Sequence, residues 1–315
     1  MRRKSIIFGI KGTKLRKSEK NILKLGRPWG VILFSRNIIN IKQLAKLTNE
    51  IRTCLGDKKY PILIDQEGGR VSRLNKIFNF KKYSQNHFGN LYKQNKFFFN
   101  KSYNVYIKNV SKILNSAGIN INTVPVLDVL RKDSNNIIGD RSYSENHILV
   151  NKIGKKCIKL FTKNNVGTVM KHIPGHGLAT SDSHKKLPII KGKTKELEKI
   201  DFYPFKKCKP HFAMTAHIIY HDYDPKHAAT HSKIIINKII RKRIGFKGLL
   251  ISDDISMKAL KFSLEENAIR ALKAGCNLVL HCNGNMKEMI KLIKVVPYID
   301  KFAIKKTTQF YQFLR

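Results

Sequence analysis

The segment of residues 171–188, KHIPGHGLATSDSHKKLP, gathers three imidazoles and a carboxylate around glycines. A metal site would need three or four ligands at fixed spacing, and the Pro-Gly pair between His172 and His176 prevents the helical turn that would align them. Asp182 precedes His184 by two residues, which suits a dyad whose carboxylate orients the imidazole and raises its basicity. The segment therefore favours an acid–base device over a metal site, with a helix cap or a solvated loop as the structural alternative.

Two further segments place carboxylates beside arginines. In IDQEGGRVSRL, Asp65 ends an apolar run, the glycine pair allows a tight turn at positive φ, and Arg70 and Arg73 are expected to begin a helical segment. In IIGDRSY, a Gly-Asp turn precedes Arg141. Such side chains can hold sugar hydroxyls by charge-assisted hydrogen bonds, or they can pair internally as loop clamps. Both interpretations stay open for Arg70 and Arg141.

A third segment, GFKGLLISDDISMKA, ends an apolar run with Asp253 and Asp254. Adjacent side chains on a strand point to opposite faces. We therefore expect only one of the two carboxylates to face a site at the end of the strand. The other should have a structural or capping role.

Eight short apolar runs recur along the chain, with helical periodicity between most of them. Each run is nearly all apolar, as a strand buried on both faces requires. In the helical segment 41–55, Leu44, Leu47 and Ile51 fall on one face. This alternation indicates an α/β fold, and eight strands are the number that closes a (β/α)8 TIM barrel. The eight runs are 6–10, 30–34, 61–65, 122–129, 166–172, 211–217, 248–254 and 277–283.

A barrel would bring these polar residues together. The runs end in Asp65, Asp128, His172, His217 and the pair Asp253–Asp254. Because a (β/α)8 barrel builds its active site from the C-terminal strand ends, they should converge on one mouth, although each alone could cap a helix. No Pro-, Gly- or Ser-rich linker divides the chain, so we expect a single catalytic domain over residues 1–315, with closing helices in 285–315.

The charge balance first suggests a polyanion partner, since 62 Lys and Arg face 21 Asp and Glu, for a net charge of +41. The basic residues are spread over the whole length, however, and no zinc-finger, helix-turn-helix or aromatic–basic motif accompanies them. Lys, Ile, Asn and Phe are abundant and share A/T-rich codons. Compositional drift therefore explains the charge better than a specific nucleic-acid partner.

The cysteines and apolar segments indicate the compartment. Five cysteines at irregular spacing, without C-x-x-C, support neither a disulfide framework nor a zinc ribbon and fit a reducing compartment. The N-terminal apolar run is too short for a signal peptide, and no segment approaches the ~20 apolar residues of a membrane span. We expect a monomeric cytoplasmic protein that needs no metal, cofactor or membrane partner.

Together these motifs resemble the bacterial β-N-acetylhexosaminidases of glycoside hydrolase family 3. The segment from Lys171 to His184 matches that family's loop motif, KH-(F/I)-PGHG-x4-D-(S/T)-H, throughout. Other segments look like family segments in family order, from about residue 30 to 283: GVILFSRN, IDQEGGRVSRL, VPVLDV, GDRSY, MTAHIIY, GFKG…SDD-x-SM and AGC-x-x-VL-x-CN.

The resemblance implies retaining hydrolysis of terminal β-linked N-acetylglucosamine, with a loop that carries no metal. By position, Asp253 would be the nucleophile, His184 the general acid/base and Asp182 its support. Sugar binding would fall to Asp65, Arg73, Arg141, Lys171 and His172. Family members of this type act in cytoplasmic peptidoglycan recycling, where they remove N-acetylglucosamine from 1,6-anhydromuramoyl fragments.

The chain departs from the family pattern in places that do not touch the proposed catalytic pair. SENHILV follows GDRSY where Gly and then Asp-Pro are usual, Asn277 replaces a common Asp, and HAATHS lacks a usual Pro. Two alternatives stay open. One is a basic polyanion-binding protein on a degenerate barrel, against which the intact motifs argue. The other is an enzyme that transfers the glycosyl group to phosphate.

Overall fold

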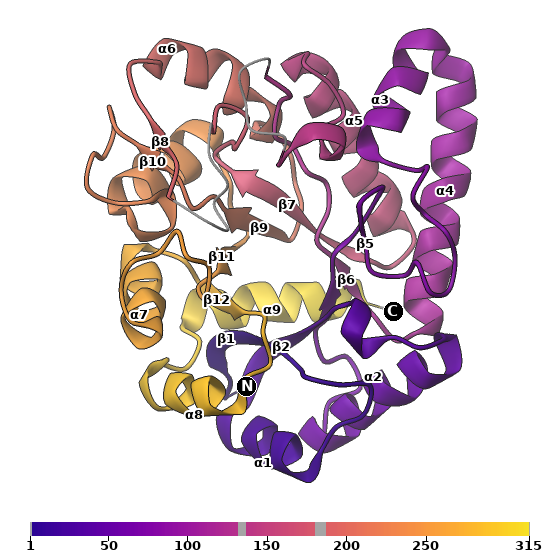
Figure 1. Cartoon of the computed structure of the whole chain (residues 1–315), viewed down its shortest axis with the longest axis vertical. Helices are drawn as coiled ribbons and strands as arrows, with labels where there is room; N and C mark the ends of the chain where they lie inside the picture. Colours follow the sequence, from indigo (N-terminus) through magenta and orange to yellow (C-terminus); the bar gives the residue numbers. More distant parts are fainter. Residues whose placement is uncertain (1, 132–136, 180–186, 315) are drawn as a thin grey trace.

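The structure is a computed structural model that describes residues 2–131, 137–179 and 187–314. Eight parallel strands close into a barrel (Figure 1), and the last strand pairs with the first. The barrel strands are β1 (Lys4–Gly9), β2 (Pro28–Leu33), β3 (Ile62–Ile64), β6 (Ile121–Asn122), β7 (Gly167–Ile173), β9 (Phe212–Thr215), β11 (Leu249–Asp254) and β12 (Leu278–His281). The predicted (β/α)8 TIM barrel is confirmed.

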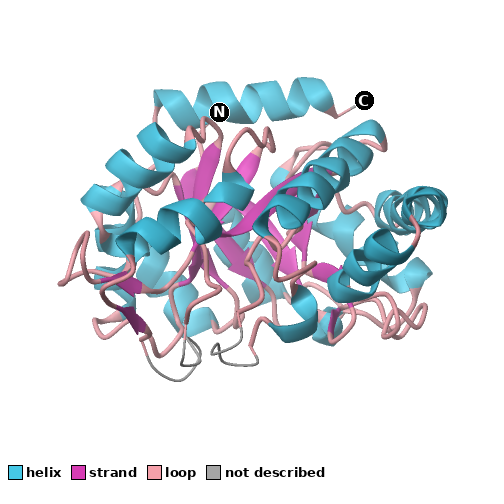
Figure 2. Ribbon diagram, turned by 90° about the horizontal axis from the view of Figure 1, so that it is seen from above, coloured by secondary structure: helices cyan, strands magenta, loops and turns pink. Residues whose placement is uncertain are grey.

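Helices form the outer layer around the strands (Figures 1 and 2). The longer ones are α1 (Lys17–Gly26), α2 (Ile41–Leu55), α3 (Gln85–Gln94), α4 (Lys96–Ser116), α5 (His147–Lys163), the π-helix η6 (Ile235–Ile244), α7 (Leu264–Ala274), α8 (Met286–Val295) and α9 (Lys301–Phe313). The shorter ones are α6 (Thr194–Glu196), the π-helix η3 (Leu197–Asp201) and the 3₁₀ turns η1 (Ser35–Asn37), η2 (Gly139–Arg141), η4 (Tyr203–Phe205) and η5 (Ala229–His231). None of the described helices is long and apolar enough to cross a membrane.

The core has two layers. Side chains such as Ile32, Leu63 and Val169 fill the inside of the barrel, while a larger cluster packs between the strands and the helices. Helix α9 crosses one end of the barrel (Figure 2). There, Trp29 Nε1 donates to Thr307 Oγ1 at 2.8 Å, and Phe310 meets the Phe212 ring edge-on at 5.0 Å. Because Trp29 and Phe212 lie at the starts of their strands, α9 closes the N-terminal end and leaves the opposite end for a site.

The fourth predicted strand is shorter than expected. Regular pairing covers only Ile121–Asn122, and the chain pairs with β7 again beyond Pro125, by an isolated bridge from Val126 to Lys171. Proline has no amide hydrogen to give to a sheet, so a regular ladder cannot run through residues 122–129.

Two small two-stranded sheets lie at the mouth of the barrel. One pairs β8 (Ile189–Ile190) with β10 (Ile219–Tyr220). The other is a hairpin of β4 (Gln66–Gly68) and β5 (Val71–Ser72), with Gly68 at φ 91° and Gly69 at φ 58°. The expectation that Arg70 and Arg73 begin a helical segment is therefore wrong. The glycine pair, with both residues at positive φ, turns the chain back on itself instead.

Candidate active site

A cavity of about 190 Å³ opens among the C-terminal ends of the strands. Six residues predicted for the site line it, namely Asp65, Arg73, Arg141, Lys171, His172 and Asp253. Ligand sites for drug-sized molecules occupy ~300–1,000 Å³, so this cavity suits a smaller unit such as one sugar ring. Asp182 and His184 lie outside the described residues.

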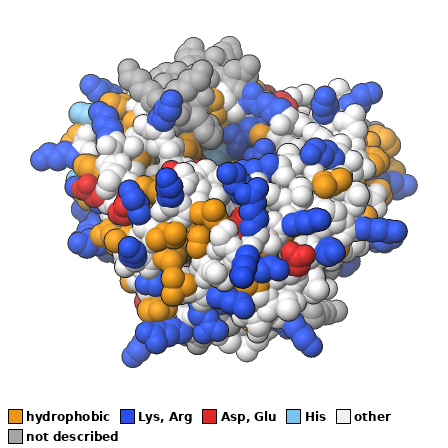
Figure 3. Space-filling model, turned by 60° about the horizontal axis from the view of Figure 1, so that its bottom comes forward, with side chains coloured by type: hydrophobic (Ala, Val, Ile, Leu, Met, Phe, Trp, Pro, Cys, Tyr) orange, Lys and Arg blue, Asp and Glu red, His pale blue; other side chains and the backbone are white. Residues whose placement is uncertain are grey.

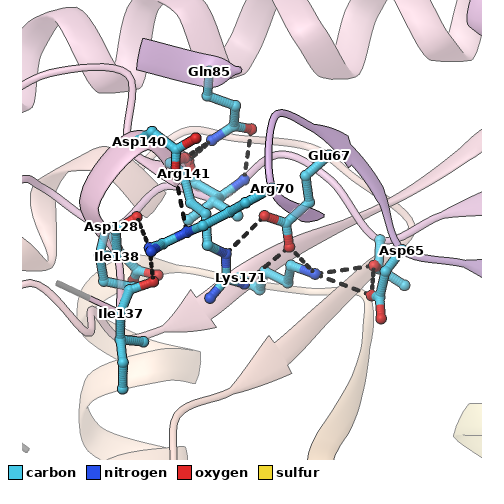
Figure 4. Close-up of polar contacts among 12 residues, drawn as sticks. Asp65, Glu67, Arg70, Gln85, Asp128, Ile137, Ile138, Asp140, Arg141 and Lys171 are labelled. Carbon is cyan, nitrogen blue, oxygen red and sulfur yellow. Dashed lines mark hydrogen bonds and ion pairs between the residues drawn. The ribbon is translucent and has the colours of Figure 1, made fainter. Parts of the chain in front are cut away.

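Lys171 lies at the centre of the polar network (Figure 4). Its ammonium contacts Glu67 Oε1 at 2.7 Å, Asp65 Oδ1 at 3.1 Å and Thr123 Oγ1 at 3.0 Å. Arg73 Nη2 contacts the other oxygen of Asp65 at 3.1 Å. Burial opposes ionisation of Asp65, but Lys171 and Arg73 outweigh it and hold the pKa of this carboxyl well below its usual range.

Glu67 is a site residue that the sequence analysis missed. Its side chain is 1% exposed and accepts from Arg141 Nε at 2.8 Å and Nη2 at 2.9 Å (Figure 4). Burial opposes its ionisation, yet Arg141 and Lys171 lower the pKa of Glu67 to about 2. Asp65 and Glu67 are two residues apart in extended chain, and this spacing places both side chains on one side. That spacing was the available signal.

The hairpin holds Arg73 in place. Gln66 Oε1 accepts from Ser72 Oγ and from the backbone N–H groups of Arg73 and Leu74, each at 3.0 Å. Asn122 fixes the hairpin to the barrel, since its amide bonds both the N–H and the C=O of Gln66, at 3.0 and 2.9 Å. The neutral side chains of Gln66 and Asn122 therefore hold the hairpin in the conformation that directs the charged side chain of Arg73.

The two open arginine assignments resolve differently. Arg70 Nε pairs with Asp140 Oδ1 at 2.9 Å, and Nη2 donates to the carbonyl of Ile138 at 3.0 Å. Arg70 is thus a loop clamp. Arg141 does both things: it lines the cavity, and it is held by Glu67.

Asp128 fixes the imidazole of His172. It lies behind the cavity wall, fully buried, and its Oδ2 is 2.7 Å from His172 Nδ1. Its Oδ1 also accepts from the backbone N–H of His176 at 2.7 Å. The carboxylate favours the tautomer with the proton on Nδ1, and it orients the ring of His172, which lines the cavity. Burial lowers the pKa of His176 to about 4, which makes it neutral near pH 7.

The neighbouring acids at the end of β11 have separate partners, although both line the cavity. The expectation that only one would face the site is wrong, because the pairing register of β11 with β12 shifts between Ile251 and Asp254 and breaks the strict alternation. Asp254 Oδ1 accepts from Ser256 N at 3.0 Å and Ser256 Oγ at 2.8 Å, which is the expected capping role.

Asp253 is disposed to be ionised. Burial opposes its charge, but the imidazoles of His217 and His172, the N–H of Asp254 and the ammonium of Lys171 together lower its pKa. Burial also lowers the pKa of His217. His217 is buried, and its Nε2 lies 3.0 Å from the carbonyl of Asp254.

The arrangement offers a carboxylate nucleophile and a ring of polar groups for hydroxyl recognition. An ionised Asp253 beside charge-assisted donors can attack an electrophilic carbon and leave as a carboxylate. The paired charges of Asp65, Arg141 and Lys171 suit a neutral, hydroxyl-rich ligand. Among residues 2–131, 137–179 and 187–314, no group of three or more His, Cys, Asp or Glu could hold a metal ion.

Comparison with known proteins identifies the family of the chain. The model of the glycosyl hydrolase family 3 N terminal domain matches residues 4–307. A β-hexosaminidase of Idiomarina loihiensis is 32% identical over 283 residues, which cover 88% of this chain and 83% of its own. One from Haemophilus ducreyi is 34% identical over 288 residues, covering 88% and 81%.

A solved structure shows the same fold over the whole length. NagZ from Neisseria gonorrhoeae, crystallised in complex with N-trifluoroacetyl-D-glucosamine, superposes with a TM-score of 0.85 at 29% identity and covers 100% of this chain and 91% of its own. The chain therefore belongs to glycoside hydrolase family 3 and is a glycosidase of the β-N-acetylhexosaminidase type.

Proposed function

We propose that the enzyme removes terminal β-linked N-acetylglucosamine from peptidoglycan fragments in the cytoplasm, with retention of configuration. The observation that carries the proposal is the place of Asp253, which lies in the same sugar-sized cavity as Asp65, Arg141 and Lys171. In this mechanism Asp253 attacks the anomeric carbon and forms a glycosyl-enzyme ester. Water then cleaves that ester.

The acid–base step is assigned to His184, with Asp182 orienting its ring. His184 donates a proton to the leaving oxygen and then takes one from the attacking water. An unperturbed imidazole has a pKa of about 6.5, so both protonation states are accessible near neutral pH. The described part of the same loop supports this role, because Lys171 and His172 begin it inside the cavity.

The five sugar-binding residues divide the work. Asp65, Arg141 and Lys171 bind hydroxyls and the acetamido group from one wall, while His172 and Arg73 complete the ring. Muropeptide fragments are acidic, and Lys and Arg side chains are spread over the surface (Figure 3). A positive field of this kind speeds the capture of anions and is screened by salt.

Trapping of the intermediate tests the assignment. A slow, fluorinated substrate analogue should label Asp253, and mass spectrometry of the digested protein locates the ester. Asp253→Asn should abolish turnover of a chromogenic N-acetylglucosaminide, and His184→Ala should cripple it while circular dichroism stays unchanged. A label on another residue, or full activity of either variant, contradicts the mechanism. Sugar 1-phosphate formed only in phosphate buffer would show phosphate as the acceptor in place of water.

A further inference from the structure

Helices α3, α4 and α5 lie side by side on the outside of the barrel (Figure 1) and pack against one another. Together they contain ten lysines and no Asp, Glu or Arg. Eight of the ten lysines are exposed: Lys93, Lys96, Lys101, Lys108, Lys112, Lys152, Lys159 and Lys163. We call the surface that these eight residues form, with the exposed apolar residues between them, the lysine face.

The lysines are aligned by helical periodicity. On α4, positions 101, 105, 108 and 112 recur every three or four residues, and on α5 positions 148, 152, 156, 159 and 163 do the same. The opposite sides of both helices bury core residues such as Phe99, Ile107 and Val150. Lys156 reaches from α5 to the side-chain oxygen of Asn100 on α4, so the two stripes are neighbours.

Large apolar side chains interrupt the charge. Phe97 is 69% exposed, Phe98 56%, Val105 59% and Ile148 56%. Two of them lie in the first turn of α4, where Phe97 and Phe98 follow Lys96 directly. Ammonium groups lie over the rings here, with Lys101 4.5 Å from the centre of Phe97. Exposed phenylalanines among lysines combine a group that leaves water readily with one that seeks negative charge.

We propose that the lysine face binds the surface of an anionic lipid bilayer. Phenylalanine side chains insert at the boundary between headgroups and acyl chains, and lysines extend their charged ends toward the headgroups. Clusters of four to eight basic residues on amphipathic helices are sufficient for such attraction. The enzyme is then a peripheral membrane protein, which adds a membrane partner where the sequence analysis expected none.

The composition of the lysine face favours a bilayer over a nucleic acid as its partner. Arginine is the residue suited to bidentate phosphate and base recognition, and α3 to α5 contain none. Diffuse attraction to a charged surface requires only lysine. Among the described residues, the acid that forms a salt bridge with the face is Glu145, paired with Lys93 at 2.7 Å. None of the residues of the face lines the catalytic cavity, so its occupation leaves the site intact.

The test is co-sedimentation of the full chain with vesicles of phosphatidylcholine containing about 30% phosphatidylglycerol, against vesicles of phosphatidylcholine alone. The wild type should bind the anionic vesicles, and binding should weaken as salt rises. The variant with Lys101, Lys108, Lys152 and Lys159 changed to Gln should bind at least about 100-fold more weakly. Phe97→Ser with Phe98→Ser should lower binding about tenfold at every salt concentration.

The matched control removes the same charge from another helix pair, by changing Lys17 and Lys24 of α1 and Lys287 and Lys294 of α8 to Gln. These lysines are also exposed. The control should bind nearly as well as the wild type, and all variants should keep wild-type turnover of a chromogenic substrate. Equal weakening by the control assigns the effect to net charge and overturns the proposal. So does absence of vesicle binding, or preference for single-stranded RNA through the same lysines.

Discussion

Glu67 offers the sharpest test of how the site is held. Glu67→Gln keeps the shape of the side chain but removes the charge shared by Arg141 and Lys171. The amide has one oxygen for three donor contacts, and its NH₂ faces donors. Because the side chains of Glu67 and Lys171 are 1% and 3% exposed and that of Arg141 is 13% exposed, water replaces the lost partner poorly, and the loss of one member of a buried network costs ~3–5 kcal/mol.

The pKa of Glu67 gives an independent magnitude. The shift from 4.5 to about 2 corresponds to about 3 kcal/mol of stability near neutral pH. Since the folded-state pKa is depressed, this contribution is fully present above about pH 4.5 and is lost as the pH falls toward 2. The stability difference between wild type and variant should therefore be about 3 kcal/mol at pH 7 and should shrink steadily below pH 4.5.

Urea unfolding between pH 7 and pH 3 measures that difference. Glu145→Gln is the control, because Glu145 is 63% exposed and its pair with Lys93 should contribute less than ~1 kcal/mol. With Arg141 and Lys171 displaced, kcat/KM on a chromogenic N-acetylglucosaminide should fall about 100-fold. If Glu67→Gln is as stable as Glu145→Gln at pH 7, or if the difference does not depend on pH, the reasoning about this network is refuted.

Two further predictions concern the barrel. Asn277→Asp should raise the free energy of unfolding by ~1–2 kcal/mol at pH 7. Asn277 Oδ1 accepts from Arg241 Nη2 and Leu250 N, each at 2.9 Å, and a carboxylate strengthens both bonds. A lower thermal midpoint at pH 7 would contradict this. Gly89→Ala should cost about 3 kcal/mol or more, since its Cβ would lie 1.7 Å from the carbonyl oxygen of Tyr143, whereas Gly12→Ala, with open space around it, should change urea unfolding by less than ~1 kcal/mol.

The barrel could be predicted because its signal is local and repeated. Strands buried on both faces must be apolar throughout, and the helices between them must show a period of 3.6, so eight independent segments supported one architecture. The helix predicted at 41–55 coincides with α2, and its Leu44, Leu47 and Ile51 are buried. The fourth strand fails at Pro125, where apolar composition persists but the amide hydrogen that a ladder needs is missing.

The residues that line the mouth of the barrel could be predicted from the sequence, but the contacts between them could be predicted less well. Residues that end strands must meet at one end of a barrel, so the convergence of Asp65, Lys171 and Asp253 follows from topology. Which carboxylate neutralises which cation depends on a hairpin only a few residues long and on a shift of strand register. The side to which a side chain points depends on such details. The sequence pattern therefore did not identify Glu67 as a site residue, and it did not predict that both acids of β11 line the cavity.

The distribution of charge also bears on the choice between an enzyme and a generic polyanion binder. Basic residues outnumber acids about threefold in the chain as a whole. Among the seven Asp, Glu, Lys and Arg side chains that line the described cavity, however, four are carboxylates: Asp65, Glu67, Asp253 and Asp254. These carboxylates would repel a polyanion from the cavity. The mouth instead carries near-balanced, densely paired charges, which suit a neutral sugar and a positive transition state better than a polyanion.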